Sequence, residues 1–259
     1  MVQTRQLRSI IWTDPHLLRY LLPLSAFLTL AGYFGPWVPH RVAGLVITGL
    51  DLGEYVKFLP VIRSGEVTLW REGFYLPLVA VSLALSLAAF RPRWGYGWPA
   101  RLLLLAAATI AALNLLPPAW DQSTFRNPEF RLQIQALLAC LGAVGISPFL
   151  ALLPAPVSNS VVLLLSVGAL WFPLRDFLRV VPAIQEIYNQ PLQPGWGVYL
   201  LTLGLLLLIA VHLADLLAQP TARLNPSKFK RLHDQTTTRL RLSKSSDHTT
   251  KQPHNPKEL

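Results

Sequence analysis

Residues 198–217, VYLLTLGLLLLIAVHLADLL, decide the fold class of this chain. The run is apolar except for a few side chains, with one histidine and one aspartate near its end. A helix of about 20 apolar residues can cross a hydrocarbon core of roughly 30 Å, because its backbone groups bond to one another as lipid requires. The run therefore predicts a transmembrane helix.

Five similar stretches precede it, so the sequence predicts an all-α, polytopic membrane protein with a six-helix transmembrane bundle. Composition supports this class, because 52% of the residues are apolar and only 14% are charged, whereas soluble domains carry about 25% charged residues. A short arm, residues 1–16, precedes the transmembrane domain, residues 17–217, and a basic tail, residues 218–259, follows it. The predicted spans are residues 17–37, 73–90, 102–120, 132–153, 157–174 and 198–217.

Two of these boundaries leave alternatives open. Only Pro154 and Pro156 separate the fourth and fifth spans, so these segments either cross the membrane in turn or form a re-entrant pair. The first span follows Arg5 and Arg8, as the apolar part of a signal peptide does. It is longer than the roughly 7 to 15 residues usual for such a segment, and we interpret it as a retained anchor.

The charges between the spans are sorted by sign, which predicts an orientation. Lys and Arg accumulate in the N-terminal arm, in residues 91–101 and in the tail, whereas residues 38–72 and 175–197 carry balanced charge. Cytoplasmic loops carry the excess of Lys and Arg. We therefore expect a multi-pass protein of the plasma (cell inner) membrane with both termini in the cytoplasm. The net charge of +10 follows from this topology, so we expect no nucleic-acid partner.

Two connections on the expected outer side have helical apolar periodicity, and each predicts an extracytoplasmic amphipathic helix. In the first, Asp51 is expected to cap the helix with Glu54 three positions later, and Pro60 is expected to end or kink it. In the second, Pro182 interrupts the stripe. The first stripe consists of Leu52, Tyr55, Val56, Leu59 and Ile62, and the second of Phe177, Val180, Val181, Ile184, Ile187 and Tyr188.

These segments have two interpretations. They lie on the outer leaflet and brace the bundle, as amphipathic helices commonly do, or they form a docking surface over an outward cavity. The charged residues of such a docking surface would be Asp51, Glu54, Lys57, Arg179 and Glu186.

Polar residues within the spans are the candidates for a functional path, because lipid makes them costly to retain. His212 and Asp215 lie one turn apart on the same helix face and form a candidate proton relay. A structural ion pair, with Arg101 or Arg223 in reach, is the more ordinary interpretation. Asn114, Gln135 and Asn159 either continue a polar path or join helices by hydrogen bonds.

Small residues predict one helix pair. Ala80, Ala84 and Ala88 recur at four-residue spacing in the second span, and similar alanines lie in the third span around Ala108 and Ala112. Close approach at small residues favours helix association in lipid. We therefore expect an antiparallel hairpin of these two spans.

The basic tail after residue 218 is rich in Ser, Thr, His and Lys, a composition that predicts disorder. Lys228, Lys230 and Arg231 are its candidates for contact with anionic lipid or a partner. A solvated tail that only fixes the topology is the alternative interpretation.

No nucleotide-binding, dinucleotide, zinc-protease or nucleophile-elbow motif is present, so the sequence predicts a protein that is not an enzyme and has no cofactor or metal. The layout resembles, in topology only, the six-span permease subunits of ABC exporters, although the long first outer connection departs from that plan. We expect a permease-like or accessory subunit of a transport system; the alternative is a non-catalytic scaffold subunit of a larger membrane complex. Either role implies membrane lipids and other membrane or peripheral subunits as partners.

Overall fold

The computed structural model describes residues 15–40, 42–117 and 126–218, and it is mostly helical. Short turns and one small two-stranded sheet connect the helices. The longer helices are α2 (Pro15–Phe34), α5 (Leu76–Ala89), α6 (Trp98–Leu113), α8 (Arg131–Gly145), α10 (Ala155–Tyr188) and α11 (Trp196–Ala218). The short helices are α3 (Gly49–Tyr55), α4 (Pro60–Arg63) and α9 (Ser147–Leu150), with the 3₁₀ turns η1 (Ala43–Leu45), η2 (Val56–Phe58), η3 (Arg71–Tyr75), η4 (Pro92–Trp94) and η5 (Pro128–Phe130).

Four helical segments in the described part are long and apolar enough to cross a membrane, which makes this a membrane protein. They are Leu17–Phe34, Arg71–Ala89, Ala155–Tyr188 and Trp196–Ala218. Helix α6 is apolar but shorter. Helix α8 ends at Gly145, just before Pro148, because proline has no N–H to continue the ladder and its ring would clash with the preceding turn. The all-α class is therefore confirmed, whereas the count of six crossings stays a prediction.

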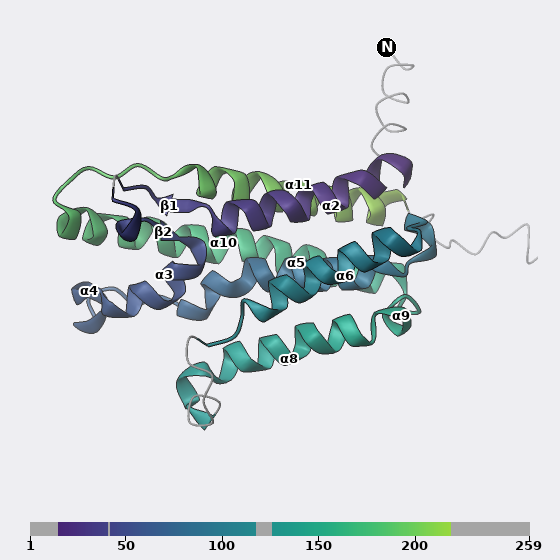
Figure 1. Ribbon diagram of the computed structural model, residues 1–259, viewed down its shortest axis with the longest axis horizontal. Coiled ribbons are helices and arrows are strands. Elements are labelled where there is room, and N and C mark those ends of the chain that lie inside the picture. Colours follow the sequence, from purple (N-terminus) through teal and green to yellow (C-terminus); the bar gives the residue numbers. More distant parts are fainter. Residues whose placement is uncertain (1–14, 41, 118–125, 219–259) are drawn as a thin grey trace, which may run out of the picture. The chain divides into compact units, whose positions relative to one another are not determined.

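The tightest helix pair joins the two ends of the described chain. Helices α2 and α11 run side by side (Figure 1), and glycines line their contact. A Cβ atom on Gly32 would meet Gly197 O at 2.6 Å, and one on Gly204 would meet Thr29 Oγ1 at 2.5 Å. Only hydrogen fits at these positions, so the two backbones touch directly.

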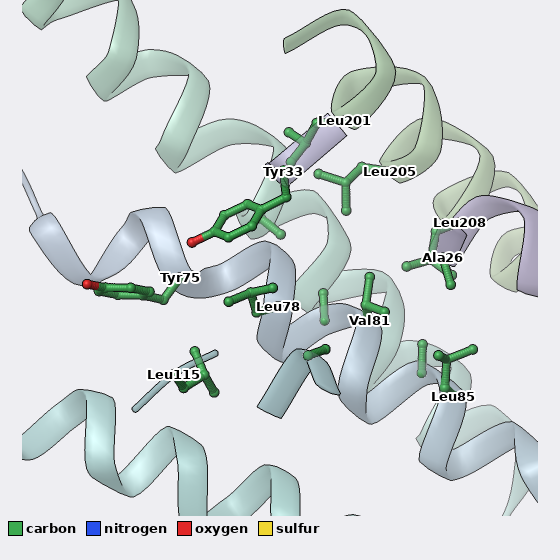
Figure 2. Close-up of a cluster of buried hydrophobic side chains, with 14 of the residues drawn as sticks. Ala26, Tyr33, Tyr75, Leu78, Val81, Leu85, Leu115, Leu201, Leu205 and Leu208 are labelled. Carbon is green, nitrogen blue, oxygen red and sulfur yellow. The ribbon is translucent and has the colours of Figure 1, made fainter. Parts of the chain in front are cut away.

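Helix α5 lies at the centre of the fold, in contact with α2, α6, α8 and α10. Its Ala80, Ala84 and Ala88 are buried, as are Ala108 and Ala112 of α6, and the two helices pack against each other as expected. Figure 2 shows Leu78, Val81 and Leu85 of α5 converging with Leu201, Leu205 and Leu208 of α11. These apolar side chains form the core that holds the bundle together.

A folded platform, residues 36–40 and 42–63, follows α2. Strand β1 (Pro36–Val38) pairs antiparallel with β2 (Ile47–Thr48), and α3 begins directly afterwards. Its cap is Thr48, whose hydroxyl accepts from the Asp51 N–H while the Asp51 carboxylate accepts from the Thr48 N–H. Asp51 is thus the third-position partner of a capping box, not the cap itself, and Glu54 takes no part in the capping.

Pro60 has the expected effect on this platform. The helical segment of α3 and η2 ends at Leu59, which is extended (ψ 131°), and α4 starts at Pro60. Leu52, Val56 and Leu59 are each at most 1% exposed. Their apolar stripe is therefore packed against the protein, because α3 contacts α2 and η3.

Helix α10 differs from the sequence prediction. A span ending near residue 174, followed by a separate amphipathic helix, was expected, but one 34-residue helix covers both and includes Pro173 and Pro182. Phe177, Val180 and Ile184 are each at most 1% exposed. Their packing against neighbouring elements outweighs the hydrogen bonds that the two prolines remove. The predicted disordered tail lies outside the described residues.

Candidate functional site

A buried polar cluster lies where three chain segments meet. The segments are the turn after α5, the start of α10 and the end of α11. In a membrane helix bundle, buried polar side chains gain most when they bind one another. The cluster consists of Arg91, Arg93, Ser158, Asn159, His212 and Asp215, and each of these except Arg93 is at most 7% exposed.

Asn159 is the centre of the cluster. Its Nδ2 donates to Asp215 Oδ2 at 2.6 Å. Its Oδ1 accepts from Arg91 Nη1 at 3.3 Å and lies 3.3 Å from His212 Nδ1. Asn159 therefore links His212 and Asp215, which were predicted to share a helix face, and it joins α10 to α11.

Arg91 fixes the start of α10. Its Nη2 donates to Ser158 Oγ and to Leu153 O, the latter at 3.4 Å. Burial lowers the pKa of Arg91, whereas the nearby Asp215 carboxylate raises it. The guanidinium thus ties the turn between α8 and α10 to the end of α5.

Arg93 supplies the counter-charge for Asp215, with Nε 2.8 Å from Oδ1. The sequence suggested Arg101 or Arg223 for this role. Arg101 instead lies over the rings of Phe90 and Trp98, and Arg223 lies outside the described residues. Gly95, with φ +59°, ends the turn η4 that contains Arg93, and no local sequence pattern linked Arg93 to Asp215.

His212 has a distinct environment within the cluster. A contact from Nδ1 to a carbonyl oxygen places the proton on Nδ1, so the neutral ring keeps an acceptor at Nε2. That Nε2 is buried and has no partner among the described residues. His212 lines a narrow pocket with Arg91, Trp94 and Ser158. The cluster can stabilise a buried charge and orient the proton on His212. Asp215 is its one carboxylate, and it contacts Arg93 and Asn159.

The structure does not bring Asn114 or Gln135 to this cluster. Asn114 follows α6, donates to Ile110 O in its own chain segment at 2.8 Å, and lines a groove beside α3. Gln135 is exposed on α8, whereas its neighbour Gln133 is buried. A single polar path through all five predicted residues is therefore not formed.

Two of the expected docking residues of the platform, Glu54 and Lys57, belong to an ion network, whereas Asp51 serves the capping box. Lys57 Nζ lies 2.6 Å from Glu54 Oε2 and 3.5 Å from Glu129 Oε1. Arg71 Nη1 reaches the same Glu129 oxygen at 2.5 Å, and the Tyr75 hydroxyl donates to Glu54 Oε1 at 3.0 Å. These contacts join residues 54–57 to η3 and to η5, which precedes α8. Sequence reasoning missed Glu129 as a partner.

Burial alone would raise the pKa of Glu129, but the hydrogen bond from Arg71 and the charge of Lys57 outweigh it and lower the pKa. Glu129 therefore stays ionised at neutral pH.

The docking residues of α10 differ in exposure. Glu186 is exposed, whereas Arg179 is half-exposed and lies 3.8 Å from Asp176 Oδ1. Asp176 is fully buried, pairs with Arg175 Nε at 2.8 Å and accepts from the Trp70 N–H at 3.3 Å. It joins α10 to the segment that leads into η3. Lys228, Lys230 and Arg231, the predicted lipid or partner contacts, lie outside the described residues.

Comparison of the chain with protein-family models, with curated proteins and with solved structures gave no match. Within residues 15–40, 42–117 and 126–218, no group of three or more His, Cys, Asp or Glu side chains is placed to hold a metal ion.

Proposed function

We propose that this protein is a non-catalytic integral membrane subunit that works by binding other membrane proteins. The observation that carries the proposal is the platform, residues 36–40 and 42–63, together with the C-terminal half of α10. Both are folded and lie at one end of the bundle (Figure 1).

The length of α10 supports this role. Its 34 residues span about 51 Å at 1.5 Å per residue, well beyond a hydrocarbon core of roughly 30 Å. Its charged residues, Arg175, Asp176, Arg179 and Glu186, all lie in the C-terminal half. That half therefore extends past the hydrocarbon and presents Leu178 and Ile187, which are 64% and 51% exposed.

The rigidity of the platform also favours docking. The ion network of Lys57, Arg71 and Glu129 and the capping box at Thr48 hold it in place. A preformed surface loses less conformational entropy when a partner binds. An accessory subunit of a transport system fits this description.

A second candidate function is solute handling by the chain itself. A groove of about 530 Å³ lies between α3 and the end of α6, lined by Asp51, Glu54, Tyr55 and Asn114 among others. Its volume suits a small molecule, and it places Asn114, one of the predicted polar-path residues, beside Asp51 and Glu54 of the platform.

The proposal includes the finer topology: six crossings of the plasma membrane, both termini in the cytoplasm, and the platform outside. Arg71 and Glu129 support it, because their contact joins the first and second expected outer connections. Arg91 supports it likewise by joining two expected cytoplasmic connections.

Co-purification tests the docking role. The tagged chain is extracted from its native membrane in mild detergent, and stoichiometric partners are identified by mass spectrometry. The double variant Glu186→Lys with Ile187→Asp should lose the partner, because both side chains are exposed on the extending half of α10.

Leu164→Ala is the matched control, since Leu164 is 73% exposed on the membrane half of the same helix. It should keep the partner. Recovery of the chain alone, or equal loss in both variants, would contradict docking through this surface.

A further inference from the structure

We infer that the end of the bundle opposite the platform contains a binding site for the phosphate of an anionic phospholipid, built by Arg19 and Arg101. This inference depends on the membrane location of the chain and not on its docking partner. Both arginines are held against aromatic rings beside the connection between α5 and α6.

Arg19 lies at the first turns of α2. Its guanidinium carbon is 5.4 Å from the ring centre of Tyr96 and 5.9 Å from that of Tyr20. The Tyr96 hydroxyl donates to Arg19 O at 2.7 Å, which fixes the ring against this helix. Stacking on aromatic faces leaves the edge donors of an arginine available to an anion.

Arg101 repeats this arrangement at the start of α6. Its guanidinium carbon lies 5.0 Å from the ring centre of Phe90 and 5.5 Å from that of Trp98. Trp98 is 65% exposed, and tryptophan favours the headgroup level of a bilayer. Arg101 is therefore placed at the depth of lipid phosphates.

The charge balance at this end favours an anion. Among the described residues it holds Arg19, Arg91, Arg93 and Arg101 against one carboxylate, Asp215, which Arg93 and Asn159 already occupy. Neither Arg19 nor Arg101 lies within 4.0 Å of a carboxylate in the described part of the chain. At the platform end, by contrast, Glu54, Glu129 and Asp176 neutralise their basic neighbours.

Two further donors point to the same ligand. Arg101 Nε is buried and has no hydrogen-bond partner among the described residues. The start of α6 has no side-chain cap, and although Pro99 has no N–H, the N–H groups of Trp98 and Ala100 also favour an anion. A phosphodiester offers acceptors for both, and its acyl chains would lie along the exposed Leu102 and Leu103 of α6.

Thermal unfolding of the purified full-length protein in detergent tests the site. Dioctanoyl phosphatidylglycerol should raise the unfolding midpoint, and dioctanoyl phosphatidylcholine at the same concentration should raise it much less. In the double variant Arg19→Gln with Arg101→Gln, the half-saturating phosphatidylglycerol concentration should rise at least about tenfold, or about 1.4 kcal/mol. Arg101→Lys should give a smaller rise, because lysine keeps the charge but loses the stacked fork.

Arg63→Gln is the matched control, since Arg63 is an exposed arginine of the platform, and its titration should equal that of the wild type. Unfolding midpoints measured without lipid show which variants fold. If the double glutamine variant does not fold, the half-saturating phosphatidylglycerol concentrations of Arg19→Lys and Arg101→Lys test the site instead. Equal stabilisation of wild type and variants by phosphatidylglycerol would overturn the site. A shift reproduced by inorganic phosphate would identify a free-anion site and overturn the lipid assignment.

Discussion

The Asn159 side chain of α10 donates to the Asp215 carboxylate of α11 across 2.6 Å, in a site where both residues are 1% exposed. The two residues are separated by more than fifty positions in the chain. With Arg93 on its other oxygen, Asp215 has a partner on each side. A carboxylate held in this way joins elements more readily than it carries protons, because proton uptake would remove the ion pair with Arg93 and weaken the bond from Asn159.

Removing the charge of Asp215 should destabilise the protein. Asp215→Asn leaves Arg93 without its counter-ion and weakens the bond from Asn159, and we expect a loss of about 1–3 kcal/mol. Thermal unfolding in detergent, with folded yield by size-exclusion chromatography, measures it. Arg93→Gln should cost at least as much, because it leaves the buried Asp215 carboxylate without its ion-pair partner.

The double variant Arg93→Gln with Asp215→Asn isolates the pair. Its loss should be smaller than the sum of the single losses, with a coupling of about 0.5–3 kcal/mol. Additive losses would show that the two residues are independent. A folded, stable Asp215→Asn protein that has lost its cellular function would instead favour the proton relay.

The sequence revealed the contacts of this site between residues that are close in the chain, but not those between distant residues. His212 and Asp215 could be paired because they lie one turn apart on one helix. Arg91 and Arg93 could not be assigned to them, because they lie far from both residues in the chain and reach them only through the packing of α5 beside α10 and of α10 beside α11. The charge sorting only suggested that the segments share one side of the membrane.

The same limit applies to the fold. The effect of Pro60 and the alanine pairing of α5 with α6 follow from local pattern, and both were predictable. Pro182 was misleading, because burial of its neighbours Val180 and Ile184 keeps α10 continuous. In the contact between α2 and α11, the α11 glycines Gly197 and Gly204 lie seven positions apart and so share one helix face, a signature that sequence reasoning missed.

That contact provides a sharp test of packing. In Gly32→Ala the new Cβ would come within 2.6 Å of Gly197 O and 2.7 Å of the Leu201 Cα. Both are backbone atoms, so α2 and α11 must move apart, and we expect a loss of about 1–3 kcal/mol. Gly142→Ala is the control, because nothing lies within 4 Å of its Cβ position on α8. It should be neutral or slightly stabilising, since alanine favours helices; similar losses in both variants would contradict the contact.

Glu129 should make stability depend on pH. Because its pKa is lowered from 4.5 in the folded state, its contribution is present above the ordinary carboxylate value and is lost as pH falls through the folded value. Glu129→Gln should lower the free energy of unfolding at pH 7, and with it the unfolding midpoint. The loss should be less than about 1 kcal/mol, because the side chain is 43% exposed. The difference from wild type should shrink below pH 4.

Glu66→Gln serves as the comparison for this titration, since Glu66 is exposed and has no ion pair among the described residues. It should leave the midpoint unchanged at both pH values. A difference between Glu129→Gln and wild type that stays constant with pH would show that the ionic contacts with Arg71 and Lys57 do not stabilise the fold.

The orientation can be tested with single cysteines, because Cys140 is the only native cysteine and is buried. In a Cys140→Ser background, Glu66→Cys should react with a membrane-impermeant maleimide in intact cells, since Glu66 lies in the first connection expected outside. Gly97→Cys, in the connection expected inside, should react only after permeabilisation. Arg126→Cys, beyond α6, should again react in intact cells, which would show that the short helix α6 crosses. The reverse labelling pattern would show that the topology is inverted. Equal labelling of Glu66→Cys and Gly97→Cys in intact cells would show that α5 does not cross the membrane.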